Sequence, residues 1–252
     1  VVKWFASFLA NRQQRVKIGC AFSNWLQLNG SMPQGSWLGP LSFIILIDDL
    51  KLSCLTHKFV DDTTVTEILS RRQQSSMQQY YNELVDWTDS NLMRINDSKT
   101  KEMIIGSDAA IVAIPPLLSS GSDQIERVDR FKLLGITISR DLKWSDHIDI
   151  ICSKASSRIH FLKLLKRSGV PTADLLHYYV SVIRPTLEYA CPVWHSSITS
   201  EQSDTLENMQ KRALRVIYGS RFTDASYCSF CNELSLSPFA DRREQLTFNF
   251  FQ

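Results

Sequence analysis

The sequence predicts an α+β protein in which an all-helical region follows a region of mixed helices and strands. Up to residue 142, several short segments alternate apolar and polar residues, as half-buried strands do. Beyond that point, apolar residues recur only at helical spacing. The 252 residues are enough to bury a hydrophobic core, and we expect two domains, 1–142 and 143–252.

A helix and a hairpin are expected at the start of the chain. Apolar residues at helical spacing predict a helix over Val1–Ala10. Alternation predicts a strand over Val16–Cys20 with a hairpin partner at Trp25–Leu28. A loop over Asn29–Ser36 then leads into a strongly apolar helix, Leu38–Leu50.

Two short strands, Leu55–Val60 and Thr63–Ile68, are predicted on either side of Asp61-Asp62. An amphipathic helix is expected over Arg71–Asn91. Three further strands and a surface loop rich in Pro, Ser and Gly complete the mixed region: strands Lys101–Ile105, Ile111–Ile114 and Phe131–Ile138, and loop Pro115–Asp123.

The all-helical region is predicted to hold four helices. The first carries an apolar stripe over 148–165. Pro171 begins the second, because a proline in the first turn costs no hydrogen bond. The third covers Ser200–Tyr218 and ends at Gly219, and the fourth covers Pro238–Phe251.

Composition and charge are those of an ordinary soluble globular protein. The apolar share is 44% and the charged share 21%, and a net charge of +2 does not by itself identify a nucleic-acid-binding protein. Six scattered cysteines lead us to expect reduced thiols and an intracellular protein of the nucleus or cytoplasm, not a secreted one. No apolar run reaches the about 18 residues of a membrane span, and Val1–Ala10 lacks a signal-peptide cleavage site. Because an initiator Met is absent, we expect a piece of a longer chain.

Asp61 and Asp62 are the strongest candidates for chemistry. Adjacent side chains of a straight strand point to opposite faces, so neighbouring carboxylates converge only at a turn. Crowded carboxylates repel each other, and a divalent cation such as Mg²⁺, which prefers oxygen ligands, relieves that repulsion. Taken alone, the pair also fits a solvated turn, because Asp favours turns. A phosphatase or nuclease metal pair is a third interpretation.

Two ordered motifs place these acids in a wider context. Pro33-Gln34-Gly35-Ser36-Trp37-Leu38-Gly39-Pro40 and an apolar helix ending in Ile47-Asp48-Asp49-Leu50 precede Phe59-Val60-Asp61-Asp62. This arrangement resembles the reverse transcriptases (RNA-directed DNA polymerases) of non-LTR retrotransposons, which are LINE-type and here jockey-like. The resemblance continues through four later segments: Asn96–Lys101, Phe131–Ile136, Arg184–Ala190 with Trp194, and Gln210–Arg215.

The resemblance implies a fold and a role for each matched residue. The expected fold is a partial polymerase palm over 1–142 and a helical thumb or connection region over 143–252. Asp61 and Asp62 would hold two Mg²⁺ ions that activate the primer 3′-hydroxyl and stabilise the transferred phosphate. Lys99 would lie near the triphosphate, although a solvated surface lysine explains it equally well.

The resemblance also implies partners: an RNA template, a DNA primer and deoxynucleoside triphosphates. The template and the incoming nucleotide would contact one group of residues: Pro33, Gln34, Gly35, Ser36 and Phe59. The primer would lie on the Leu-Gly segment of the primer grip, which is Leu134-Gly135 in this sequence.

The sequence departs from the family pattern at three points. Ser31-Met32 stands where Gly-Val is usual, and Val60 stands where Ala is usual, so a β-branched side chain crowds the primer end. The family takes a further catalytic Asp from a strand upstream of the Pro-Gln-Gly loop, and no acid precedes Asp48 here. We therefore expect these 252 residues not to polymerise alone. The alternative is a non-catalytic nucleic-acid-binding remnant or a domesticated palm–thumb fragment.

Cations without intervening acids mark the first helix of the helical region: Lys154, Arg158, Lys163, Lys166 and Arg167. We expect them to contact backbone phosphates with salt-sensitive affinity, and a solvated helix face is the alternative. Cys228-Ser229-Phe230-Cys231 is a lone Cys-x-x-Cys. Zinc is not expected there, because a structural zinc site needs four ligands.

Overall fold

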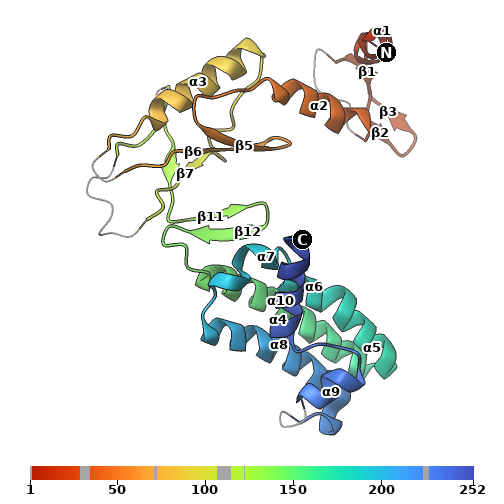
Figure 1. Cartoon of the computed structure of the whole chain (residues 1–252). Coiled ribbons are helices and arrows are strands. Elements are labelled where there is room, and N and C mark those ends of the chain that lie inside the picture. The colour runs from red at the N-terminus through yellow and green to blue at the C-terminus, as the bar shows by residue number, and fades with distance from the viewer. Residues whose placement is uncertain (1, 29–34, 71–72, 107–114, 122, 224–226) are drawn as a thin grey trace. The chain divides into compact units, whose positions relative to one another are not determined.

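The computed structural model describes residues 2–28, 35–70, 73–106, 115–121, 123–223 and 227–252 (Figure 1). It divides the chain into two compact units. The first comprises Val1–Asp97 and Ala113–Gln124, and the second comprises Ser98–Val112 and Ile125–Gln252. The described residues form helices and small, mainly antiparallel sheets, which confirms the mixed helix-and-strand prediction. The assignment of palm and thumb stays a prediction.

The first unit begins with helix α1 (Val2–Leu9), followed by four two-residue strands that pair antiparallel, β1 with β4 and β2 with β3. Their bounds are Gln13–Gln14, Lys17–Ile18, Ala21–Phe22 and Leu26–Gln27 for β1 to β4. The prediction of one half-buried strand over Val16–Cys20 was wrong. Gly19 takes a φ of 59° between β2 and β3, so the chain turns back there, and all four strands are exposed.

The centre of the first unit is formed by helix α2 (Leu38–Asp48), the antiparallel hairpin of β5 (Leu55–Phe59) and β6 (Asp62–Thr66), and helix α3 (Met77–Ser90). The predicted hairpin is therefore confirmed. Helix α3 begins later than the predicted Arg71, and residues 71–72 lie outside the described part. Its start is set by Glu67, whose carboxylate accepts the backbone N–H of Ser76 at 2.9 Å.

Short strand pairs lie on both sides of the unit boundary. In the first unit β8 (Ser119–Ser120) pairs with β9 (Asp123–Gln124), so the segment predicted as a loop over Pro115–Asp123 contains one strand and the first residue of another. In the second unit β7 (Lys101–Glu102) pairs in parallel with β10 (Glu126–Arg127), so the strand predicted over Lys101–Ile105 is shorter than expected. The strand predicted over Ile111–Ile114 lies outside the described residues.

The single strand predicted over Phe131–Ile138 is instead an antiparallel hairpin of β11 (Arg130–Leu133) and β12 (Ile136–Ser139). Leu134 and Gly135 form its two-residue turn, with φ angles of 46° and 88°. Positive φ at both central residues is the pattern of a type I′ turn, whose twist matches that of the strands. Strand β11 is more exposed than β12, which packs against the first helix of the helical region.

Within the described residues, the chain after Trp144 contains only helical elements, as expected. They are α4 (Ser145–Arg167), α5 (Thr172–Tyr178), the π-helix η1 (Tyr179–Ile183), α6 (Arg184–Glu188), α7 (Cys191–Trp194), the 3-10 turn η2 (His195–Ser197), α8 (Ser200–Tyr218), the 3-10 turn η3 (Gly219–Arg221), α9 (Tyr227–Glu233) and α10 (Phe239–Phe250). Pro171, Gly219 and Pro238 stand at the predicted helix ends. The short helices α7 and α9 were not predicted.

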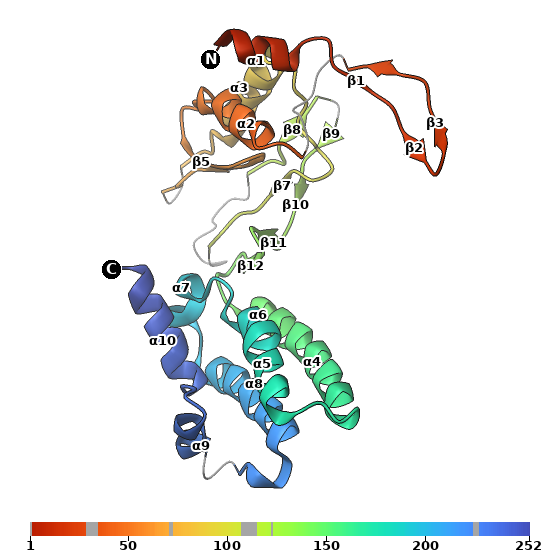
Figure 2. The same cartoon turned by 90° about the vertical axis from the view of Figure 1, so that its right-hand side faces the viewer.

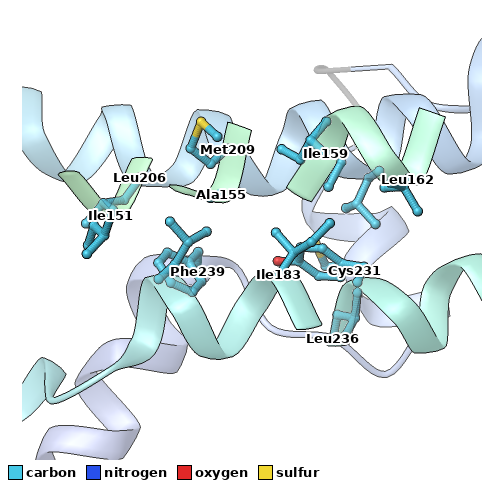
Figure 3. Close-up of a cluster of buried hydrophobic side chains, with 14 of the residues drawn as sticks. Ile151, Ala155, Ile159, Leu162, Ile183, Leu206, Met209, Cys231, Leu236 and Phe239 are labelled. Atoms are coloured by element: carbon cyan, nitrogen blue, oxygen red, sulfur yellow. The ribbon is translucent and has the colours of Figure 1, made fainter. Parts of the chain in front are cut away.

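The hydrophobic core of the second unit forms where α4 and α8 lie side by side (Figure 2). Figure 3 shows Ala155 and Ile159 of α4 beside Met209 of α8, with residues of other elements facing them: Ile183, Cys231, Leu236 and Phe239. Each fully buried Ile or Leu contributes about 1.5–3 kcal/mol. The helices therefore hold together through burial, and none of the described helices is long and apolar enough to cross a membrane.

Candidate active-site turn and nucleic-acid contacts

Asp61 and Asp62 lie at the turn of the β5–β6 hairpin. Phe59 pairs with Asp62 at the last position of the register, so Val60 and Asp61 are the two turn residues. Both carboxylates are exposed. The turn is the geometry in which two adjacent acids leave the strict alternation of a strand. The structure thus places the pair where the sequence indicated, while the roles of the two acids stay predictions.

Val60 gives this turn an unusual backbone. Its φ is 55°, whereas Asp61 has no positive φ. This is the pattern of a type II′ turn, in which glycine is preferred at the first central position. A β-branched residue with positive φ is a strained conformation. The hairpin register of five residue pairs holds the turn in place despite that strain.

A complete metal centre is not assembled by the described residues. Among them, no group of three or more His, Cys, Asp or Glu side chains is placed to hold a metal ion. Two exposed carboxylates at one turn supply hard oxygen ligands of the kind Mg²⁺ takes, but a two-metal site needs more of them. The residues present therefore fit part of such a site and not a whole one.

The segment before α2 is described from Gly35 onward, so Pro33 and Gln34 lie outside the described residues. Gly35 has a φ of 76° and open space around its Cα. The carbonyl of Ser36, which precedes α2, accepts the backbone N–H of Gly39 at 3.3 Å. Trp37 is 97% exposed. The loop therefore presents exposed groups, and the template contacts expected of it stay predictions.

Lys58 connects α2 to the hairpin, a contact that the sequence did not indicate. Its ammonium donates to the carbonyls of Ile47 at 2.8 Å, Asp48 at 3.2 Å and Leu50 at 3.1 Å. These carbonyls lie at and just beyond the C-terminal end of α2, where the helix carries partial negative charge; that of Ile47 also accepts the backbone N–H of Leu50 at 3.2 Å. The neighbouring Phe59, which is 61% exposed, and the two acids are thereby fixed relative to α2.

Lys99 is exposed in a turn of the second unit, whereas Asp61 and Asp62 belong to the first. Its predicted role near a triphosphate remains a prediction. Beside it in sequence, Asp97 of the first unit accepts hydrogen bonds from Tyr81 at 3.0 Å and Ser120 at 2.8 Å. Burial, opposed in part by the hydrogen bond with Ser120, raises the pKa of Tyr81, so its phenol stays a donor.

The five cations predicted to form one stripe on α4 do not all face solvent. Arg158 donates to the carbonyl of Val182 at 2.6 Å and also contacts Thr186. Lys166 contacts the carbonyl of Ile217 near the end of α8. Both cations therefore hold α4 against neighbouring helices. The remaining three lie on two sides of the buried stripe, namely Lys154 on one side and Lys163 and Arg167 on the other.

Helix α8 adds cations that the sequence analysis did not assign. Three contacts follow α4 and α8 in the same order along both helices: Ser145 with Gln202, Ser156 with Arg212, and Lys166 with Ile217. The two helices thus run parallel, and their C-terminal halves lie together. Neither 150–173 nor 208–223 contains an Asp or a Glu. Arg212 and Arg215 are exposed on this part of α8, so an acid-free surface spans both helices.

Cys228 and Cys231 are free thiols within α9, the first exposed and the second buried. Among the described residues, no third His, Cys, Asp or Glu side chain joins them in a group that could hold a metal ion. Burial is the main cause that raises the pKa of the Cys231 thiol, which lowers its tendency to act as a thiolate ligand.

Residues 2–138 match the family described as reverse transcriptase (RNA-dependent DNA polymerase). Because the match covers more than half of the chain, the chain belongs to that family, which is one of nucleotidyltransferases. The family generally uses a divalent metal, a nucleic-acid template and nucleotide substrates. The resemblance seen in the Pro-Gln-Gly and Asp-Asp motifs is thereby confirmed at the level of the family.

Three similar proteins come from Drosophila melanogaster transposons. The chain is 24% identical over 225 residues to a probable RNA-directed DNA polymerase from transposon X-element, covering 84% of this chain and 24% of the relative. It is 23% identical over 235 residues to the probable polymerase from transposon BS, covering 88% and 25%. It is 25% identical over 230 residues to the RNA-directed DNA polymerase from mobile element jockey, covering 85% and 24%. The relatives confirm the non-LTR, LINE-type resemblance, and the chain spans about a quarter of their length. No solved structure matches the chain.

Proposed function

We propose that this chain is a portion of an RNA-directed DNA polymerase that performs templated nucleotidyl transfer during retrotransposition. One observation carries the proposal: the family match over 2–138 contains an Asp-Asp pair at a hairpin turn. The mixed region would be the palm, and the helices after Trp144 the thumb. The first would bring Asp61 and Asp62 to the reacting phosphate, and the second would hold the template–primer.

Asp61 and Asp62 would bind the family's divalent metals, for which we propose two Mg²⁺ ions. Bound Mg²⁺ would supply charge stabilisation at the transferred phosphate. The chain's own part is to hold two carboxylates at a fixed turn, and the Lys58 contacts with α2 keep that turn in place. Because the described residues bring no third acid to the pair, we propose that residues 1–252 alone do not polymerise.

The acid-free surface of α4 and α8 would track the phosphate backbone of the template–primer. Arg158 and Lys166 are engaged within the fold, so the proposal rests on four other cations: the half-buried Lys163 and the exposed Arg167, Arg212 and Arg215. The exposed Lys154 lies on the other side of the buried stripe, and its phosphate contact stays a prediction from the sequence. Neutralising phosphates releases counterions, which makes such binding sensitive to salt.

Primer extension tests the catalytic part of this proposal. Purified 1–252 is incubated with a labelled DNA primer on an RNA template, Mg²⁺ and all four deoxynucleotides, and the products are resolved on a gel. We expect no extension above the level of an Asp61→Asn variant. Extension that is lost in Asp61→Asn but kept in Asp86→Asn, a matched change on α3, would contradict the proposed incompleteness.

A second candidate function is that of a nucleic-acid-binding fragment without chemistry. The observation that favours it is the contrast between a partial carboxylate set and an acid-free surface over two helices. The two candidates are separated by adding residues from upstream in the same open reading frame. A longer chain that extends primers with dependence on Asp61 supports the polymerase, and one that only binds supports the fragment.

A further inference from the structure

Tyr189, at the end of α6, reaches the turn of the β11–β12 hairpin across 55 positions of sequence. Its hydroxyl donates a hydrogen bond to the carbonyl of Leu134 at 2.8 Å. A type I′ turn leaves its central carbonyls directed outward, so this bond fixes a group that the hairpin itself does not use. The contact joins the predicted primer-grip segment to the helices.

Gly135 is required by this contact as well as by the turn. A Cβ at position 135 would lie 2.9 Å from Cε1 of Tyr189 and 3.2 Å from its hydroxyl oxygen. Those distances are shorter than van der Waals contact, so a side chain there would displace the ring. The positive φ of 88° independently favours glycine. The absence of a side chain at Gly135 therefore leaves room for the ring of Tyr189.

The helical region holds Tyr189 in turn. Fully buried Trp194 donates its indole N–H to the carbonyl of Tyr189 at 3.1 Å, and Ala190 follows with a φ of 50°. The preceding Glu188 accepts from Arg242 of α10 at 3.0 Å. Contacts from α7 and α10 thus hold the backbone at and next to Tyr189 in place.

A second attachment joins strand β12, close to the same turn, to α4. The backbone N–H of Thr137 in β12 donates to Nδ1 of buried His147 at 3.3 Å. Both attachments lie within the second compact unit, whereas the Asp61-Asp62 turn belongs to the first.

We propose that Tyr189 is a positioning residue: it sets the place of the Leu134-Gly135 turn, so that the segment expected to hold the primer 3′ end follows the helices. The inference rests on the proposed function for its nucleic-acid part. The structural claim, that the Tyr189 hydroxyl holds the hairpin turn through one hydrogen bond, rests on the contacts alone. The primer end would then be held on the same compact unit as the binding helices.

The experiment uses residues 1–252 and the Tyr189→Phe variant, which removes only the hydroxyl from a side chain that is 54% exposed. Amide hydrogen exchange is followed across Leu133–Arg140. Losing one neutral hydrogen bond is expected to raise exchange there about two- to tenfold. Tyr218→Phe, which removes a hydroxyl from α8 of the same unit, is the control and is expected to leave exchange at Leu133–Arg140 unchanged.

Position is read by photo-crosslinking from a 4-thiothymidine at the primer 3′ end. We expect the wild-type crosslink in Leu133–Arg140, and a several-fold lower yield in Tyr189→Phe while overall affinity for template–primer changes less than about twofold. Gly135→Ala is expected to reproduce both changes, because its Cβ displaces the ring.

Each outcome bears on a different part of the inference. Unchanged hydrogen exchange in Tyr189→Phe overturns the claim that the Tyr189 hydroxyl holds the turn in place. Raised exchange with an unchanged crosslink overturns the positioning role. A wild-type crosslink outside Leu133–Arg140 overturns the primer-grip assignment of the proposed function, and the exchange data then decide the claim about the Tyr189 hydroxyl on their own.

Discussion

At the scale of single residues, Val60 is where the candidate active-site turn departs from the usual chemistry of hairpins. Its φ of 55° places a β-branched side chain in the left-handed region, at a cost of about 1–2 kcal/mol. Strain of this kind persists only where the surroundings fix the backbone, and it is found at functional sites. Here the β5–β6 register and the Lys58 contacts provide that fixation.

Val60→Gly is expected to stabilise the hairpin by about 0.5–1 kcal/mol, because relief of the left-handed strain exceeds the entropy cost of glycine. Hydrogen exchange over Leu55–Thr66 measures the effect as slower exchange. Val65→Gly is the matched control in β6, and it should weaken the strand and speed exchange. Faster exchange in Val60→Gly would contradict the strained-turn account.

The sequence was informative for residues whose placement depends on near neighbours. Asp61 and Asp62 could be assigned to a turn because the alternation on either side is local. The contacts of Lys58 with α2 and of Tyr189 with Leu134 could not be predicted, because they depend on how separate elements pack. Arg158 and Lys166 were assigned to a solvent-facing stripe, since helical spacing alone does not show which neighbours accept from them.

At the scale of elements, the β11–β12 hairpin depends on a neutral His147. Its Nδ1 accepts from Thr137, and among the described residues its buried Nε2 has no hydrogen-bond partner. Burial, and secondly the charge of Lys154, hold the pKa of His147 below the ordinary value of 6.5. A lowered histidine pKa contributes stability that is present above about pH 6.5 and is lost as pH falls through the folded-state pKa.

The second unit should therefore lose stability on going from about pH 7.5 to about pH 5.5. In His147→Asn the side-chain oxygen can accept from Thr137 without titrating, so the loss should be smaller. Some loss should remain, because burial also lowers the pKa of His195. Urea midpoints of both proteins at the two pH values measure this. Equal losses in both would show that His147 does not couple the hairpin to pH.

Element boundaries were predicted well where a residue type dictates them, and poorly where a contact does. Gly219 and Pro238 ended and began helices as expected. The start of α3 depends on the carboxylate of Glu67, which periodicity does not reveal. The prediction of a single strand over Phe131–Ile138 was wrong. Apolar and polar residues alternate in both halves, as they would in one strand, and Leu134 is not a residue type that marks a turn with positive φ.

At the scale of the whole molecule, the paired acids and the acid-free helices belong to different compact units. The family could be recognised from the order of the motifs alone, and the match over 2–138 agrees. What the sequence did not show is that α8 adds to the charged surface of α4, since that depends on the parallel packing of the two helices.

The most direct test of the central claim is the salt dependence of binding to a fluorescent RNA–DNA template–primer, followed by anisotropy with residues 1–252. If about three to five phosphates are neutralised, log affinity should fall against log salt with a slope of about −3 to −5. The triple variant Lys163→Glu, Arg167→Glu, Arg212→Glu should make that slope less negative by about three and weaken binding strongly. The matched variant Lys3→Glu, Lys17→Glu, Lys51→Glu, which has the same charge change in the first unit, should keep most of the affinity. Salt-independent binding, or equal losses in the two variants, would contradict the account.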